Sequence, residues 1–130
     1  MTAMTKDKVR REREGRAYGY PVLGGLQIFF GSLVAITAAG KAVPVGHTDG
    51  QHCVGLAKNS ADNRDDDADP PFVEAVKGVY ALDFDTAPTH ADIKKPVYAV
   101  DDGTVTLTSG TLLVGTLDGI DGTEFFVRID

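Results

Sequence analysis

The amino-acid sequence predicts an all-β fold: a small barrel or sandwich of about eight short strands, with one short helix and an extended N-terminal arm. Three observations predict it. Apolar and polar residues alternate in several short runs, which is the period of a strand. Turn-forming pairs such as Ser109-Gly110 separate these runs. Glycine is frequent, with 15 residues in 130, whereas tryptophan is absent, and this composition favours a turn-rich β protein over a helical bundle.

A chain of this length forms one domain with a modest core. We therefore expect a single β domain over residues 21–130, preceded by an arm over residues 1–20 that shows no apolar periodicity. Residues 1–16 carry six Lys or Arg against three acidic residues, a net charge of +3. Because the whole chain has a net charge of −6, the remaining residues carry −9.

This charge distribution limits the classes of partner. An acidic body repels nucleic acid, so we expect no nucleic-acid partner. A short basic arm on an acidic body is typical of a tether that binds an acidic protein surface. A solvated tail without a partner is the alternative.

Eight runs are predicted to be strands, with breaks at turn-forming residues. They are residues 26–30, 33–37, 54–58, 72–84, 96–100, 104–108, 112–117 and 124–129. In the longest run, the apolar residues at even positions are expected to share one face. They are Phe72, Val76, Tyr80, Leu82 and Phe84.

The connections between these runs carry their own signals. Asp102-Gly103 between two alternating runs predicts a hairpin. Thr89 and Asp92 have the spacing of a capping box and predict one helical turn, which Pro96 ends. Residues 58–71 are acidic and end in two prolines, so we expect a variable surface loop with almost nothing to bury.

Residues 22–40 contain no charge, and a membrane-spanning segment must be considered for them. Four glycines divide this stretch into short pieces, and Gln27, Ser32 and Thr37 interrupt its apolar character. We therefore expect no membrane partner.

Candidate metal-binding and catalytic groups are few. The acidic residues of 58–71 fit no register of an EF-hand loop, because neither possible start puts glycine sixth and glutamate twelfth. These residues are Asp62, Asp65, Asp66, Asp67 and Asp69. His47, His52 and Cys53 are close in sequence, but neighbouring residues of a strand point to opposite faces and do not easily reach one ion.

The remaining reactive groups also favour structural roles. Cys53 begins an apolar run, which predicts a buried and inert thiol. Asp118, Asp121 and Glu124 cluster at one turn, where exposed carboxylates normally start a hairpin. We expect no enzyme, no cofactor and no bound metal.

Five segments resemble, in chain order, a family of tailed-phage capsid decoration (head cement) proteins, a domain-of-unknown-function group often encoded beside the major capsid protein. They are YPVLGGLQIFFGSLVAITAAGKAVP (20–44), VGLA (54–57), KGVY (77–80), ADIKKPVYAVDDGTVT (91–106) and GTLDGIDGTEFFVRI (115–129). The resemblance spans about residues 17–130. Lys94-Lys95-Pro96 departs from it, because the family usually has glycine after the "A-D-I" motif. The acidic loop 58–71 also departs from it and resembles an insertion or a variable tip.

The resemblance implies a β-barrel-like protein made in the host cytoplasm that sits on the outer capsid surface of the virion and stabilises neighbouring major capsid subunits. From it we expect the major capsid protein as partner and a homo-oligomer, a trimer around a lattice axis. The expected capsid-binding residues lie in the arm: basic side chains that pair with carboxylates and two tyrosines that fill apolar pockets. They are Lys6, Lys8, Arg10, Arg11, Arg13, Arg16, Tyr18 and Tyr20. Alternatives are a tail, fibre or carbohydrate-recognition module, and a small metal-dependent hydrolase that uses His47, His52 and Cys53.

Overall fold

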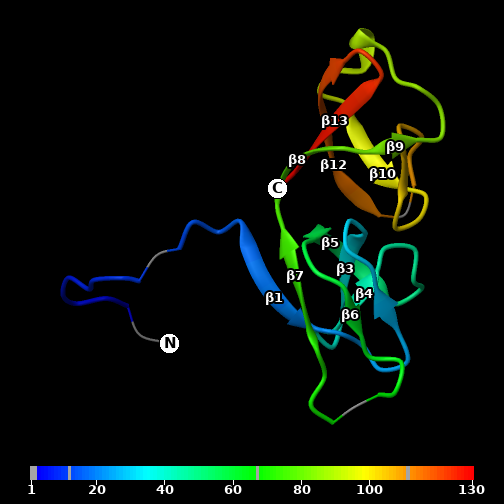
Figure 1. The fold of residues 1–130 in the computed structure, drawn as a ribbon. Coiled ribbons are helices and arrows are strands. Elements are labelled where there is room, and N and C mark those ends of the chain that lie inside the picture. Colours follow the sequence, from blue (N-terminus) through cyan, green and yellow to red (C-terminus); the bar gives the residue numbers. More distant parts are fainter. Residues whose placement is uncertain (1–2, 12, 67, 111) are drawn as a thin grey trace.

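The computed structural model describes residues 3–11, 13–66, 68–110 and 112–130, and within them the chain forms two β sheets and a small two-stranded ladder (Figure 1). One helical turn of the 3₁₀ type, η1 (His90–Asp92), lies before β10. The strands are β1 (Ala17–Pro21), β2 (Gln27–Ile28), β3 (Leu33–Thr37), β4 (Ala42–Pro44), β5 (Gly50–Ala57), β6 (Ala61–Asp62), β7 (Phe72–Val76), β8 (Gly78–Ala81), β9 (Asp83–Phe84), β10 (Pro96–Ala99), β11 (Thr104–Thr106), β12 (Leu113–Asp121) and β13 (Glu124–Ile129).

The N-terminal sheet has five antiparallel strands in the order β1-β7-β5-β3-β4 and forms the lower half of the molecule in Figure 1. β3 is buried on both faces, with Leu33 and Ala35 on one side and Val34 on the other. This double burial explains why residues 33–36 form a continuous apolar run. β1 lies at the edge of the sheet and pairs with β7.

The C-terminal sheet has six strands in the order β8-β13-β12-β10-β11-β9. β8 and β9 occupy opposite edges of this sheet, yet a single residue, Leu82, joins them in the chain. The sheet is therefore strongly curved, because the short stretch from β8 through Leu82 to β9 forms both of its edges. The β12–β13 hairpin turns at Gly122, whose φ of 64° favours glycine. The ladder does not close into a barrel, because β8 and β9 do not pair with each other.

Both sheets contribute to one hydrophobic core. The N-terminal half supplies five of its buried residues and the C-terminal sheet supplies six. They are Leu33, Ala35, Val43, Val45 and Leu56, and Val97, Val105, Val114, Leu117, Val127 and Ile129. A hydrogen bond from the Leu33 N–H to the Asp102 carbonyl, 2.9 Å long, also joins the two halves. The molecule is thus an all-β, sandwich-like fold with a shared interior.

A second, smaller core lies on the opposite face of the N-terminal sheet, where β2 and β6 pair with each other. Its residues are Val22, Ile28, Val34, Ala42, Ala57, Ala61, Val73 and Ala75. Asn63 is 2% exposed, and its Nδ2 donates a hydrogen bond to the Val22 carbonyl at 2.8 Å. The expectation that residues 58–71 bury almost nothing is therefore wrong for Ala61 and Asn63, which anchor the loop to this core.

Several expectations are confirmed. The fold is all-β, and strands lie at residues 33–37 and 124–129 with the expected bounds. The hairpin at Asp102-Gly103 is present, since the Val100 N–H donates to the Thr104 carbonyl at 2.9 Å. The helical turn begins after Thr89, whose N–H donates to the Asp92 carboxylate at 2.8 Å.

Two expectations about strand boundaries are corrected. The run 72–84 is three strands, because Gly78, with φ of 154°, redirects the chain from one sheet to the other. Within β7 the buried face carries Val73 and Ala75, whereas Phe72 is 57% exposed. The arm is also shorter than expected: β1 begins at Ala17, so residues 17–20 belong to the sheet.

Candidate interaction surface

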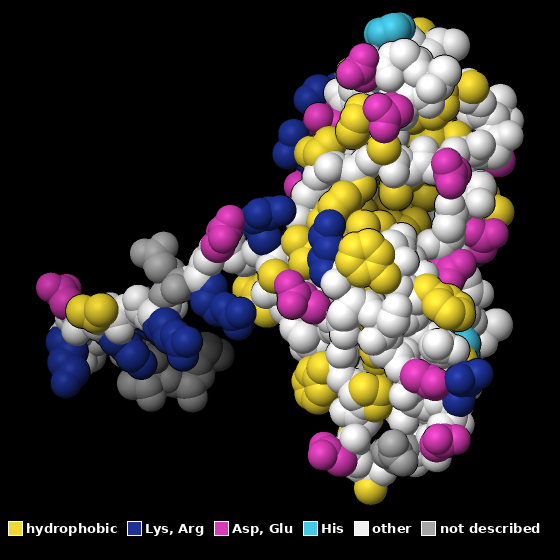
Figure 2. Space-filling view, viewed as in Figure 1, with side chains coloured by type: hydrophobic (Ala, Val, Ile, Leu, Met, Phe, Trp, Pro, Cys, Tyr) yellow, Lys and Arg dark blue, Asp and Glu magenta, His cyan; other side chains and the backbone are white. Residues whose placement is uncertain are grey.

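The basic arm projects away from the β domain (Figure 2). Lys6, Lys8, Arg10 and Arg11 are exposed, and Figure 2 shows Lys and Arg side chains gathered along this segment. The Arg10 guanidinium is 3.5 Å from the Met4 sulfur. These cations are therefore presented to solvent at a distance from the acidic body, which is the arrangement that attracts an acidic surface.

The base of the arm is held against β1 by Arg13. Its guanidinium lies over the Tyr18 ring, 4.6 Å from the ring centroid. The same group donates a long hydrogen bond, 3.5 Å, to the Ala17 carbonyl. Arg16 lies 3.8 Å from the Glu14 carboxylate, and both side chains are exposed, so this ion pair adds little stability.

Tyr18 and Tyr20 do not lie on a free arm, contrary to the expectation from the sequence. Both belong to β1, and their side chains share the face opposite Ala17 and Gly19. Tyr20 packs against the second core, and Arg13 covers the ring of Tyr18. Of the eight predicted capsid-binding residues, Tyr20 is thus a structural residue, and only the six basic ones remain available as a group.

Two hollows lie beside the base of the arm, on the outer face of the β1–β7 ladder. The first has a volume of about 560 Å³ and the second about 320 Å³. The first is lined by Arg13, Ala17, Tyr18, Gly19, Asn59, Phe72 and Glu74. Sequence reasoning missed Phe72 as a surface residue, because both alternating sets of residues in β7 are mostly apolar. In β1, Pro21 lies opposite Phe72 and Gly19 lies opposite Glu74, and the missing side chain at Gly19 is the signal that this face is open.

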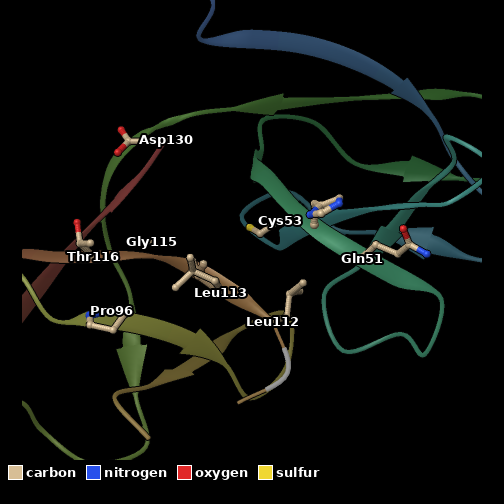
Figure 3. A pocket seen from close by; sticks show the side chains of 10 residues that line it. Gln51, Cys53, Pro96, Leu112, Leu113, Gly115, Thr116 and Asp130 are labelled. Carbon is tan, nitrogen blue, oxygen red and sulfur yellow. The ribbon is translucent and has the colours of Figure 1, made fainter. Parts of the chain in front are cut away.

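The groups proposed for a hydrolase are not brought together as a set. A pocket of about 510 Å³ between β5 and β12 is lined by His52, Cys53, Thr116 and Asp130, with Pro96 and Leu112 opposite β5 (Figure 3). His47 does not line this pocket, and its Nδ1 accepts a hydrogen bond from the Asp49 N–H at 3.2 Å. Among the described residues, no three His, Cys, Asp or Glu side chains are grouped so that they could hold a metal ion.

The Cys53 thiol is poorly suited to act as a nucleophile. It packs against the shared core, and burial raises its pKa to about 11, although a hydrogen bond with the Gly55 backbone opposes this shift. We expect the folded protein to react with a thiol reagent at pH 8 at least about 100-fold more slowly than the protein in denaturant, because only about one thiol in a thousand is ionised at that pKa. Equal reaction rates in the two states would contradict this prediction.

The raised pKa of Cys53 also predicts how the free energy of unfolding changes with pH. Between pH 9 and pH 11 the unfolded thiol, with its ordinary pKa of 9.0, loses its proton while the folded thiol keeps it. The free energy of unfolding therefore falls as the pH rises through this window. Cys53→Ala is expected to flatten that part of the stability profile in a denaturant titration.

Two of the carboxylates singled out from the sequence, Asp118 and Asp62, are paired with arginine side chains. Asp118 accepts a hydrogen bond from Arg128 at 3.1 Å, and Asp121 lies opposite Glu124 at the end of the β12–β13 hairpin. In the acidic loop, Asp62 pairs with Arg64 at 2.8 Å, and hydrogen bonds from Arg64 lower the pKa of Asp62 to about 2. Asp67 lies outside the described residues.

No helix in the described part of the chain has the length and apolar character needed to cross a membrane. Comparison with known proteins identifies no relative: no family model matches the chain, and no curated protein or solved structure matches it.

Proposed function

We propose that this chain is a tailed-phage head decoration protein, which binds the outer capsid surface and bridges neighbouring major capsid subunits. The observation that carries the proposal is the separation of charge between a projecting basic arm and an acidic β domain (Figure 2). The resemblance of residues 17–130 to this family supplies the identity of the partner.

The mechanism is adhesion. If the residues that precede β1 were fully extended on a partner, residues 3–16 would span up to about 45 Å. Basic side chains along this segment pair with carboxylates of the shell. A ligand that binds only the assembled lattice opposes its disassembly, because its binding free energy is lost when the lattice comes apart.

The proposed form on the capsid is a trimer around a lattice symmetry axis. Closed cyclic symmetry is the usual form of a homo-oligomer. Mass measurement of the protein released from heads tests this part, and a cryo-EM map with isolated single copies would contradict it.

The test of the proposal is co-sedimentation with undecorated tailed-phage heads, assembled from a major capsid protein. We expect the protein to pellet with the heads in stoichiometric amounts and to raise the temperature at which they disrupt. Binding should weaken as salt is raised, because screening acts over about 10 Å at 0.1 M salt. Heads that leave the protein in the supernatant at low salt would contradict the function.

A further inference from the structure

β1 is an edge strand that pairs with β7 on one side, and its other edge faces no strand of the sheet among the residues that the structure describes. The Lys77 N–H donates to the Arg16 carbonyl at 2.8 Å, and the Val22 N–H donates to the Pro71 carbonyl at 3.0 Å. In an antiparallel ladder alternate residues face opposite sides, so the even-numbered residues of this stretch face β7. Ala17 and Gly19 therefore direct their N–H and C=O groups away from the sheet, and Pro21 directs only a carbonyl outward.

Arg13 lies across this edge. Its hydrogen bond to the Ala17 carbonyl is 3.5 Å long, well beyond the usual 2.9 Å, and is easily replaced by the N–H of an incoming strand. The displaced guanidinium would then be free to meet a carboxylate of that strand. The Arg13 side chain thus covers the edge of β1 in the unbound chain, and it can bind a carboxylate of the partner once it is displaced.

The hollow of about 560 Å³ lies on the face next to this edge. Gly19 contributes no side chain to it, and Phe72 forms an exposed apolar wall. The side chain of Asn59 is already used, since it donates to the Phe72 carbonyl at 3.1 Å and accepts from the Glu74 N–H at 2.7 Å. The apolar part of the hollow, beside Phe72, therefore fits an apolar side chain, while Arg13 and Glu74 supply its charged lining.

We propose that the edge of β1 docks an extended acidic segment of a partner protein, which adds to the sheet beside Ala17 and Gly19. One apolar side chain of the segment fills the hollow beside Phe72, and its carboxylates meet the basic arm, which continues directly from β1. That this segment belongs to the capsid rests on the function proposed above, whereas its chemistry follows from the edge, the hollow and the charge of the arm.

The test uses the full chain and a capped peptide of four Val-Asp repeats as the probe. The peptide should bind and slow hydrogen exchange at the Ala17 and Gly19 amides, with little change at Tyr18 and Tyr20, whose amides already face β7. A peptide of four Val-Lys repeats should bind at least tenfold more weakly. Equal binding of the two peptides, or protection confined to another strand, would overturn the proposal.

A matched pair of variants isolates the backbone contribution. Gly19→Pro removes an N–H that faces away from β7, so the existing ladder is kept, and proline is tolerated at such edge positions. Gly19→Ala keeps the N–H and adds the same Cβ, which would lie 3.3 Å from Phe72. We expect G19P to weaken peptide binding at least tenfold relative to G19A, and equal affinities would overturn the proposal.

A third measurement does not depend on how the variants fold. A Val-Asp peptide that is N-methylated at every residue cannot donate backbone hydrogen bonds from either edge, and its binding to the unmodified chain should be lost. Full binding of this peptide would overturn the proposal. A further outcome would also overturn the proposal: the chain forms a dimer in sedimentation, G19P abolishes the dimer, and the unmodified peptide fails to bind. In that case the edge of β1 would pair with a second copy of this chain.

Binding of the two variants to undecorated heads distinguishes this inference from the proposed function. Head binding that is equal for G19P and G19A would leave the function standing and show that the capsid does not use this edge. Peptide binding at β1 without any binding to heads would support the edge site and contradict the function.

Discussion

Removal of residues 1–14 is expected to leave a folded β domain that binds undecorated heads at least tenfold more weakly, a loss of about 1.4 kcal/mol. The shortened chain keeps β1 and both cores but lacks Lys6, Lys8, Arg10, Arg11 and Arg13. The loss should be largest at low salt, because it comes mainly from exposed charges. Co-sedimentation measures the binding, and circular dichroism with a melting curve verifies the fold.

The control for charge is reversal of Arg10 and Arg11 to glutamate in the full-length chain. This variant should reproduce part of the loss, and the loss should shrink as salt rises. A matched reversal of Lys94 and Lys95, beside η1, should leave head binding nearly unchanged. If the shortened chain is folded and binds as well as the full chain, adhesion lies on the β domain and the arm is a solvated tail.

Removal of residues 1–20, the whole arm as the sequence predicts it, is a different experiment. It deletes most of β1 and removes Tyr20 from the second core. We therefore expect a lower melting temperature in addition to weaker binding, which would confuse adhesion with stability. The boundary at Ala17 decides which deletion is informative.

Leu117→Ala is expected to lower the free energy of unfolding by about 3 kcal/mol, the usual cost of a cavity at a fully buried leucine. Leu117 is completely buried in the core that both sheets share. Because that core joins the two halves, the whole chain should still unfold in a single transition, measured by denaturant titration with far-UV circular dichroism. Leu113→Ala is the control, since Leu113 is 55% exposed and should cost much less.

Two separate transitions in this titration would contradict the shared core. They would show that the N-terminal and C-terminal sheets unfold independently. A loss below about 1 kcal/mol at Leu117 would contradict its position as a close-packed residue.

Local pattern predicted the bounds of the strands at residues 33–37 and 124–129, but it extended the strand at 104–108 too far, because β11 ends at Thr106. Residues 124–129 place Phe125, Val127 and Ile129 on one face and follow Gly122, and residues 33–36 are apolar between Gly31 and Gly40, so these strands could be predicted. β1 could not, because its pattern alternates aromatic residues with small ones. Tyr18 and Tyr20 face inward while Ala17 and Gly19 face outward, and the usual apolar–polar contrast is missing.

The same limit applies to the candidate site. The charge of the arm is a property of composition and could be predicted, but the partial burial of Tyr20 depends on the second core, whose residues come from distant parts of the chain. Which face of β7 is buried also depends on residues that are distant in the sequence. Phe72 and Val73 are both apolar, and only the second core makes Val73 the buried one.

The shared core has a consequence for folding during synthesis. All five strands of the N-terminal sheet are complete once residue 76 has been made, but six of the residues that cover its inner face come from residues 97–129. Leu33, Ala35 and Leu56 therefore lack most of their apolar neighbours until β13 leaves the ribosome. A nascent chain of this protein passes through a stage with an uncovered hydrophobic sheet, which is the stage at which aggregation or chaperone binding competes with folding.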